Sequence, residues 1–227
     1  MKFLIVQTGA APAPVRRRFG DYPQWFRRGL GIPAGQIECV RVDRGGRLPS
    51  PRGMTAALVT GSDAMVSERH AWSERTAAWL GHAVDAGLPL LGVCYGHQLL
   101  AHALGGRVDY NPRGEEIGTI EVRKLGAGRA DVLFGALPVR FPAQATHEQS
   151  VIRLPAGATV LATSDQDAHQ AVRFAPRVWG VQFHPEFGVR EMRAYLDDER
   201  QADLRRNVRG CPDARGILRR FARLCLR

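Results

Sequence analysis

The chain has few cysteines, and their spacing does not suggest a set of disulfide bonds or metal sites that would hold a fold together. Its 227 residues include four cysteines, Cys39, Cys94, Cys211 and Cys225, and no Cys-x-x-Cys pair. Small disulfide-bonded secreted domains and zinc ribbons use denser, paired cysteines. We therefore expect a protein of a reducing compartment, the cytoplasm.

Long hydrophobic runs are also missing. Only four apolar residues, Phe3 to Val6, precede Gln7, which is too few for the core of a signal peptide. No run approaches the length of a membrane span, so we expect no membrane contact. Repeats, low-complexity tracts and linkers are absent as well. The sequence therefore predicts one domain over residues 1–227, with a core of about residues 1–187 and a C-terminal helical extension of about residues 188–227.

Acidic residues are fewer than basic ones. The chain has 32 Lys and Arg against 22 Asp and Glu, a formal net charge of +10. Such a charge is compatible with nucleic-acid binding. However, the arginines are scattered and interleaved with acidic residues, and no basic tail, zinc finger or RNA-recognition motif is present. We predict a solvated, Arg-rich surface and no nucleic-acid partner.

The most informative stretch that the chain does contain is a strand, a sharp turn and a helix around Cys94. The apolar residues 90–93 predict a buried strand, and residues 95–104 carry apolar side chains at helical spacing. Cys94 lies between Gly92 and Gly96, two residues from each. Nucleophiles of Gly-x-Ser-x-Gly hydrolases occupy a tight, strained turn of this kind.

Such a turn favours chemistry at the sulfur. The positive end of the following helix would favour a thiolate at Cys94, and the Tyr95 N–H could meet an oxyanion on the attacked carbon. The alternative is a buried structural cysteine, the commoner fate of a cysteine in an apolar run. The two flanking glycines and the helix weigh against this alternative, but on this stretch alone both interpretations stay open.

The order of the remaining elements predicts the fold class. Strands are expected at residues 2–7, 36–42, 56–60 and 90–93, and helices at 15–30, broken near 22–23, and at 65–87. Alternating strands and helices imply a parallel sheet with right-handed crossovers. A meander of short strands added to the sheet is expected at 116–122, 139–145, 151–154, 158–163, 170–174 and 178–183, followed by helices at 190–209 and 213–226.

A cysteine nucleophile needs a base, and His184 is the best placed of the seven histidines. It ends a predicted buried strand, Pro185 stops that strand, and Glu186 follows. In an extended segment positions i and i+2 face the same side, so the carboxylate can lie beside the imidazole and orient it. Taken alone, His-Pro-Glu would be better explained by a loop with a surface carboxylate.

Together the two motifs carry a resemblance. The stretch Gly92-Val-Cys-Tyr-Gly-His-Gln-Leu-Leu and the later Gln182-Phe-His-Pro-Glu resemble, in sequence, order and spacing, the class I glutamine amidotransferases. The chain looks like free-standing proteins similar to the glutaminase domain of GMP synthase. The resemblance implies an α/β, flavodoxin-like three-layer sandwich with a mainly parallel central sheet, extra short strands in the second half and C-terminal helices. It also implies a catalytic triad of Cys94, His184 and Glu186.

Further site residues follow from the same resemblance. The family's Ser-Gly-Gly-Pro oxyanion loop matches Thr60-Gly61-Ser62-Asp63, so the backbone N–H groups of Ser62 and Tyr95 are the expected oxyanion donors. Gln98 and Gly61 match substrate-binding positions. His147 does so within residues 146–151, where Gln149 replaces the family's Asp. No metal or organic cofactor is implied.

Several functions remain open at this stage. The chain could hydrolyse the γ-amide of glutamine and pass ammonia to a separate synthetase, since it has no P-loop or ATP-pyrophosphatase domain of its own. It could instead be a free-standing hydrolase of another γ-glutamyl amide or peptide. A binding module with a vestigial triad is a weaker alternative, and a basic nucleic-acid-binding domain is the weakest.

Overall fold

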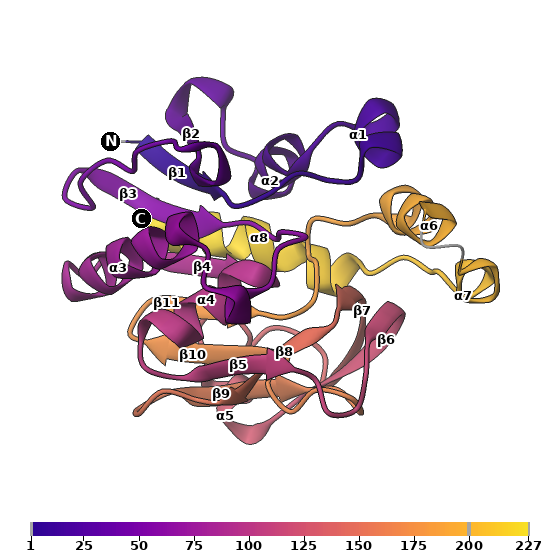
Figure 1. Ribbon diagram of the computed structural model, residues 1–227. Helices are drawn as coiled ribbons and strands as arrows, with labels where there is room; N and C mark the ends of the chain where they lie inside the picture. The colour runs from indigo at the N-terminus through magenta and orange to yellow at the C-terminus, as the bar shows by residue number, and fades with distance from the viewer. Residues whose placement is uncertain (1, 199–200, 227) are drawn as a thin grey trace.

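A nine-stranded sheet forms the middle layer of the computed structural model, which describes residues 2–198 and 201–226 (Figure 1). Its strands are β1 (Lys2–Gln7), β2 (Ile37–Arg41), β3 (Met54–Val59), β4 (Leu90–Val93), β6 (Glu116–Lys124), β7 (Arg140–His147), β9 (Thr159–Thr163), β10 (Ala171–Ala175) and β11 (Val178–Val181). Their order across the sheet is β2-β1-β3-β4-β11-β10-β9-β6-β7. Neighbours from β2 to β11 run parallel, and those from β11 to β7 run antiparallel.

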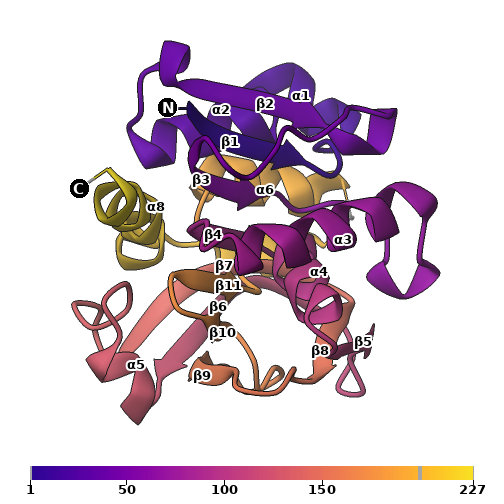
Figure 2. The same cartoon turned by 90° about the vertical axis from the view of Figure 1, so that its left-hand side faces the viewer.

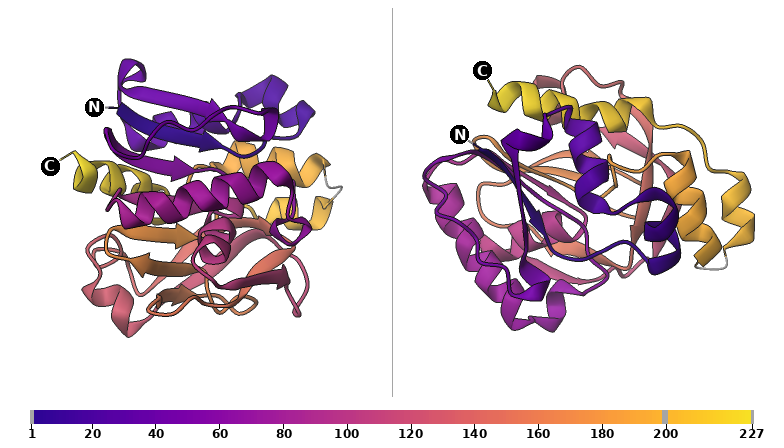
Figure 3. Two further views of the ribbon diagram at one scale, coloured as in Figure 1. Left: turned by 60° about the vertical axis from the view of Figure 1, so that its left-hand side comes forward. Right: turned by 90° about the horizontal axis from the view of Figure 1, so that it is seen from above.

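Helices cover both faces of the parallel half (Figures 2 and 3). The helices are α1 (Ala13–Phe19), α2 (Tyr22–Leu30), α3 (Ala71–Asp85), α4 (Tyr95–Ala103), α5 (Gly126–Ala130), α6 (Val189–Asp198), α7 (Ala202–Arg206) and α8 (Pro212–Cys225), with 3-10 turns η1 (Ala34–Gln36), η2 (Val42–Arg44) and η3 (Val66–Glu68). Phe3 and Ile5 of β1 pack with α2 and α8, whereas Leu4 and Val6 pack with α3 and α4. Successive strand residues face opposite sides, so one apolar run serves two cores.

The predicted fold class is confirmed. The structure has an α/β fold with parallel strands at its centre, additional short strands in the second half and helices at the C-terminus. The antiparallel strands make the complete sheet mixed. Within the described ranges, none of the helices is both long enough and apolar enough to cross a membrane.

One predicted helix is divided differently from expectation. The break falls at Gly20 and Asp21, so Tyr22 and Pro23 begin α2 instead of interrupting a helix. The Asp21 carboxylate accepts a hydrogen bond from the Tyr22 N–H at 2.9 Å. An acidic N-cap followed by proline in the first turn is a helix start, because proline has no N–H to leave unsatisfied there.

The second half of the chain also differs in detail. The strand expected at 151–154 is β8 (Gln149–Arg153), which pairs with β5 (Arg107–Tyr110) in a separate two-stranded sheet. The sequence did not predict β5, because only Val108 of its four residues is buried. The helix expected at 190–209 is divided into α6 and α7, and residues 199–200 of that prediction lie outside the described residues.

The turn after β4 has the predicted strained geometry. Cys94 has φ 50° and ψ −105°, a conformation that L-residues rarely adopt. A Cβ at Gly92 would lie 2.4 Å from the Gly96 carbonyl oxygen, and one at Gly96 would lie 2.4 Å from the Val59 carbonyl oxygen. Both neighbours are backbone atoms that cannot move aside cheaply. The two glycines therefore allow α4 to start directly against β3.

We predict that Gly96→Ala destabilises the protein by about 1–3 kcal/mol, because the new methyl group overlaps the β3 backbone. Gly81→Ala is the matched control: position 81 is inside α3, and a Cβ there meets no atom within 4 Å. The control should stabilise the helix by about 0.5–1 kcal/mol. Urea unfolding of both variants measures these changes. Equal stability of Gly96→Ala and the unmodified protein would contradict the packing argument.

Candidate active site

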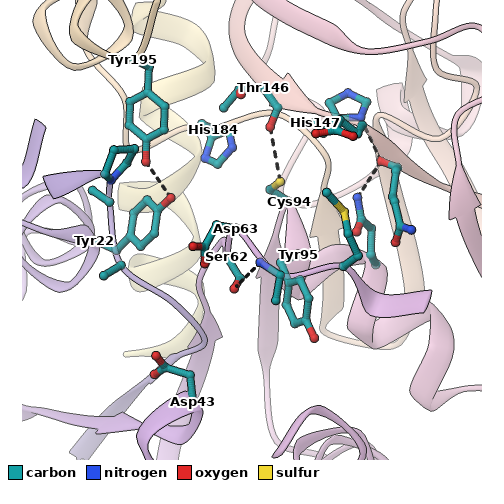
Figure 4. A pocket seen from close by; sticks show the side chains of 18 of the residues that line it. Tyr22, Asp43, Ser62, Asp63, Cys94, Tyr95, Thr146, His147, His184 and Tyr195 are labelled. Carbon is teal, nitrogen blue, oxygen red and sulfur yellow. Dashed lines mark hydrogen bonds between the residues drawn. The ribbon is translucent and has the colours of Figure 1, made fainter. Parts of the chain in front are cut away.

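The predicted nucleophile and base lie at the ends of two adjacent strands. β4 and β11 pair in parallel with Val93 opposite Val181, and the Cys94 N–H donates to the Val181 carbonyl at 2.8 Å. The chain beyond β11 therefore runs beside the Cys94 turn. Figure 4 shows Cys94 and His184 at the same pocket. The carboxyl ends of neighbouring parallel strands are where open α/β sheets commonly place their sites.

The contact between His184 and Glu186 is made in a turn. His184 Nδ1 lies 2.8 Å from Glu186 Oε1, and both side chains are almost completely buried. We expected an extended segment, but the Phe187 N–H donates back to the His184 carbonyl, which closes a turn. The Phe187 ring then stacks on the imidazole, with ring centroids 4.2 Å apart. The turn and the stacked ring fix the orientation of His184.

The second imidazole nitrogen of His184, Nε2, is not used by a hydrogen bond to any described residue. His184 Nε2 is buried and has no hydrogen-bond partner among the residues described. The Cys94 thiol makes a long contact of 3.8 Å to the Thr146 carbonyl. Gly61 packs against both side chains, since a Cβ there would lie 3.1 Å from His184 Cε1 and 3.8 Å from Cys94 Cβ. Any side chain at position 61 would fill the space between cysteine and histidine.

Charges around His184 favour its protonated form. Burial by itself lowers the pKa of this imidazole, but the negative charges of Glu186 and Cys94 outweigh burial and raise it to about 10. Glu186 Oε2 has no hydrogen-bond partner within residues 2–198 and 201–226, so His184 supplies the charged contact to that carboxylate. A buried carboxylate is costly without such a partner.

Two backbone N–H groups remain free where oxyanion donors were expected. Tyr95 is the first residue of α4, and neither its N–H nor that of Ser62 has an acceptor in the described part of the chain. Positive φ angles outside glycine are confined there to Arg69, Cys94 and Arg177, so Ser62 has ordinary backbone geometry. The Ser62 hydroxyl donates to the Thr8 carbonyl at 2.9 Å and is therefore held by the β1 loop.

The opposite wall is built by Gln98 and the segment after β7. Gln98 Nε2 donates to the Gln149 carbonyl at 2.7 Å and to Gln182 Oε1 at 3.0 Å. His147 lies at the wall, but its ring nitrogens lie 3.0 Å from Glu116 Oε2 and 3.0 Å from the same Gln149 carbonyl. Its imidazole is thus engaged by protein groups, and the wall is held to β6.

These groups surround a cavity of about 470 Å³. All of the predicted site residues line this cavity except Gly61 and Glu186, which contact His184 from behind the cavity wall. The cavity is also lined by Tyr22 and Tyr195, which the sequence analysis missed. No spacing rule links a residue of α2 to one of α6, so no sequence signal for this pair was available.

The described residues offer no metal centre: none of their His, Cys, Asp and Glu side chains gather in threes in a way that could hold an ion. Asp43, which lines the cavity, is paired with Arg41 at 3.0 Å and lies 3.7 Å from Arg44.

Comparison with known proteins gives a family. The family model described as glutamine amidotransferase class-I matches residues 63–201. The chain is 36% identical over 159 residues to GMP synthase (glutamine-hydrolyzing) of Aeropyrum pernix, covering 70% of this chain and 29% of that protein. It is 39% identical over 105 residues to one subunit of the GMP synthase (glutamine-hydrolyzing) of Methanocaldococcus jannaschii, covering 46% and 54%. The chain thus spans less than a third of the first relative and about half of the second.

Solved structures agree on the fold. A glutamine amidotransferase of Thermotoga maritima superposes with a TM-score of 0.75 at 20% identity, over 99% of this chain and 98% of that one. A glutamine amidotransferase of Methylobacillus flagellatus gives a TM-score of 0.76 at 22% identity, over 99% and 92%. The family model covers more than half of the chain and includes the strand–turn–helix of Cys94 and the His184 turn. This chain therefore belongs to the class I glutamine amidotransferase family, as its two motifs predicted.

Proposed function

We propose that this protein hydrolyses the γ-amide of glutamine through a thioester on Cys94, releasing glutamate and ammonia. The observation that carries the proposal is the pairing of β4 with β11. It sets a strained cysteine at a helix N-terminus beside a buried histidine that contacts Glu186 at 2.8 Å. A nucleophile, a base and an orienting carboxylate in one cavity are the parts that cysteine acyl transfer requires.

The reaction has two stages. In the first, the Cys94 thiolate attacks the γ-carbonyl carbon, and the C–N bond breaks as the His184 imidazolium gives its proton to the departing nitrogen. In the second, neutral His184 takes a proton from water, whose oxygen attacks the thioester carbonyl. The C–S bond then breaks, and glutamate leaves. Glu186 keeps the imidazole in position throughout and stabilises its charged form.

Backbone donors and the far wall hold the substrate. The N–H groups of Tyr95 and Ser62 meet the tetrahedral oxyanion, a contribution of about 3 kcal/mol for each donor. Gly61 leaves room for the acyl group beside His184. Gln98 Oε1 and the wall that contains His147 face the amino-acid end of the substrate. Gln98 Nε2 is already held by Gln149 and Gln182, so its orientation is set before substrate binds.

The name of one relative bears on the fate of the ammonia. The relative from Methanocaldococcus jannaschii is one subunit of a GMP synthase, as its name states. We therefore propose that a separate synthetase is the acceptor. The setting is a reducing one such as the cytoplasm: all four cysteines are free thiols, and the reaction requires a reduced Cys94.

A free-standing hydrolase of larger γ-glutamyl amides is the second candidate. The favouring observation is the size of the cavity, about 470 Å³, which extends well beyond the cysteine. In the binding mode proposed above, glutamine occupies only the part between Cys94 and Gln98. The chemistry at Cys94 would be the same, with an amine in place of ammonia as the leaving group.

We predict that Cys94→Ala abolishes glutamate release and covalent labelling by a glutamine-like electrophile, because the acyl-accepting atom is lost. Cys39→Ala, which changes an exposed thiol on β2, should keep both. The assay measures glutamate from glutamine and from a panel of γ-glutamyl amides, with and without candidate synthetases. Turnover of no γ-glutamyl compound under any of these conditions would refute the enzyme proposal.

We predict that Glu186→Gln lowers kcat by about 10²- to 10⁴-fold, since a neutral amide stabilises the imidazolium less and does not fix its tautomer. The loss should be smaller than that of Cys94→Ala. Glu121→Gln, at an exposed pair with Arg140, is the control and should leave kcat unchanged. A Glu186→Gln enzyme with normal kcat would remove Glu186 from the mechanism.

We predict a pH-dependent stability from His184. Its pKa is about 10 in the folded protein, against 6.5 as its ordinary value. The folded state therefore binds this proton more tightly, so the stabilisation is complete below pH 6.5 and is lost as pH rises toward 10. His184→Asn removes the titration while keeping a donor for Glu186.

The measurement for this prediction is the free energy of unfolding of both proteins in urea at several pH values. The difference between the unmodified protein and His184→Asn should shrink steadily as pH rises. Cys94→Ala should reduce that pH dependence, because the cysteine charge is one of the causes of the raised pKa. A difference that stays constant from pH 6.5 to 10 would argue against the charged histidine.

A further inference from the structure

A second imidazole–carboxylate pair lies at the wall that faces the amino-acid end of the substrate. Glu116 begins β6 and His147 ends β7, and the two residues lie opposite each other in the antiparallel pairing. They are 3% and 6% exposed, and Glu116 Oε2 lies 3.0 Å from His147 Nε2. Figure 4 shows His147 and His184 on opposite sides of Cys94. We call Glu116 and His147 the wall pair.

The surroundings of Glu116 favour its ionised form. The Ser164 hydroxyl donates to Glu116 Oε1 at 2.6 Å, and it accepts from the Asp167 N–H at 2.9 Å. Gln170 Nε2 donates to Glu116 Oε2. Hydrogen bonds to both oxygens stabilise the charged form of a buried carboxyl group. The acidic member of the wall pair is therefore a carboxylate.

Both ring nitrogens of His147 then meet atoms that can only accept. Nδ1 lies 3.0 Å from the Gln149 carbonyl oxygen, and Nε2 meets the Glu116 carboxylate. Neither oxygen carries a hydrogen, so the imidazole must supply one to each hydrogen bond. A buried carboxylate also requires a compensating charge. His147 is therefore an imidazolium that donates from both nitrogens.

The other titratable groups around the wall pair do not alter this arrangement. Burial lowers the pKa of His97 to about 3, so this neighbour is neutral. Asp167 accepts from the Ser150 hydroxyl and from the His169 N–H, each at 2.6 Å. Three exposed carboxylates line the same cavity: Asp63, Glu115 and Glu148. The hydrogens of His147 are fixed by the atoms that its two nitrogens meet, so these exposed side chains do not decide their positions.

The Gln149 carbonyl connects the wall pair to Gln98. The oxygen that faces His147 Nδ1 also accepts from Gln98 Nε2 at 2.7 Å. Gln98 Nε2 donates in addition to Gln182 Oε1 at 3.0 Å. Because Nε2 is used in this way, the amide of Gln98 is turned so that Oε1 remains for a ligand. The orientation of Gln98 thus depends on a carbonyl that His147 holds.

We propose that Glu116 is a positioning residue for the amino-acid end of the substrate, acting through His147 and the Gln149 carbonyl on Gln98. This inference rests on the proposed function of the same cavity. His147, which the sequence placed among the substrate-binding residues, acts here at one remove and transfers no proton. Without the Glu116 charge, His147 no longer has to donate from both nitrogens, and the Gln149 carbonyl loses a fixed donor.

Nitrogen NMR of protein with isotope-labelled histidines tests the state of His147 without turnover. At about pH 7.5, where an ordinary histidine is mostly neutral, we expect His147 to show the two N–H signals of an imidazolium. Exposed His82 provides the comparison signal, and His147→Gln assigns the resonances. Glu116→Gln should convert the His147 signals to those of a neutral ring. A neutral ring at His147 in the unmodified protein would overturn the inference.

Steady-state kinetics tests the positioning role. Glu116→Gln should raise KM for glutamine by roughly tenfold, the value of one well-placed hydrogen bond, and change kcat much less. Glu121→Gln is the matched control, because it makes the same change at an exposed position of β6 and should leave both constants unchanged. Ser164→Ala, which removes one donor to Glu116 and keeps the wall pair, should raise KM by about threefold. Normal KM in folded variants at both positions would contradict the role.

A binding measurement separates this inference from the proposed function. Calorimetry of glutamine with Cys94→Ala protein needs no turnover, and adding Glu116→Gln should weaken binding by roughly tenfold. Binding that stays unchanged, or no glutamine binding to Cys94→Ala protein, would overturn the inference. Tight binding that Glu116→Gln weakens, together with no turnover by the unmodified protein, would support the inference and refute the proposed hydrolysis.

Discussion

The parallel pairing of β4 with β11 is the contact on which the candidate site depends. These strands lie next to each other in the sheet although about 90 residues separate Cys94 from His184. The register of this pairing sets Val93 opposite Val181, so the two segments leave the sheet at the same level. The Cys94 N–H donates the last hydrogen bond between them, to the Val181 carbonyl. The intervening strands can therefore vary in arrangement without moving the cysteine relative to the histidine.

A buried ionic group follows from that pairing. His184 leaves β11 into the interior, where burial disfavours its charge, yet Glu186 and Cys94 raise its pKa to about 10. The arrangement holds only while both partners are present, since an uncompensated charge at this depth is strongly destabilising. Stability and chemistry are thus linked at one imidazole. The stacked Phe187 ring and the turn at Glu186 contribute to both.

Sequence reasoning could predict the parts of the fold that local pattern specifies. The turn at Cys94 is predicted by its two flanking glycines and by the change from strand spacing to helix spacing of the apolar residues. The buried strands are predicted by short apolar runs. The motif at His184 needed the cysteine motif to be distinguished from a loop. β5 could not be predicted, because a single buried valine among polar residues gives no alternating pattern of apolar and polar side chains. The pair of Tyr22 with Tyr195 is a long-range contact between two helices, and such contacts leave no local signal.

The departures from the family's motifs change side chains at places where the proposed chemistry uses the backbone. The Ser62 hydroxyl donates to the Thr8 carbonyl. Gly9 makes room for the Ser62 side chain, since a Cβ at position 9 would lie 2.7 Å from Ser62 Oγ. Gln149 ties its side chain to Ser67 while its carbonyl accepts from Gln98. Backbone donors and acceptors therefore keep their directions while the cavity walls are altered. In the proposed reaction, replacements of this kind change which γ-glutamyl compound fits and leave the way its bond is broken unchanged.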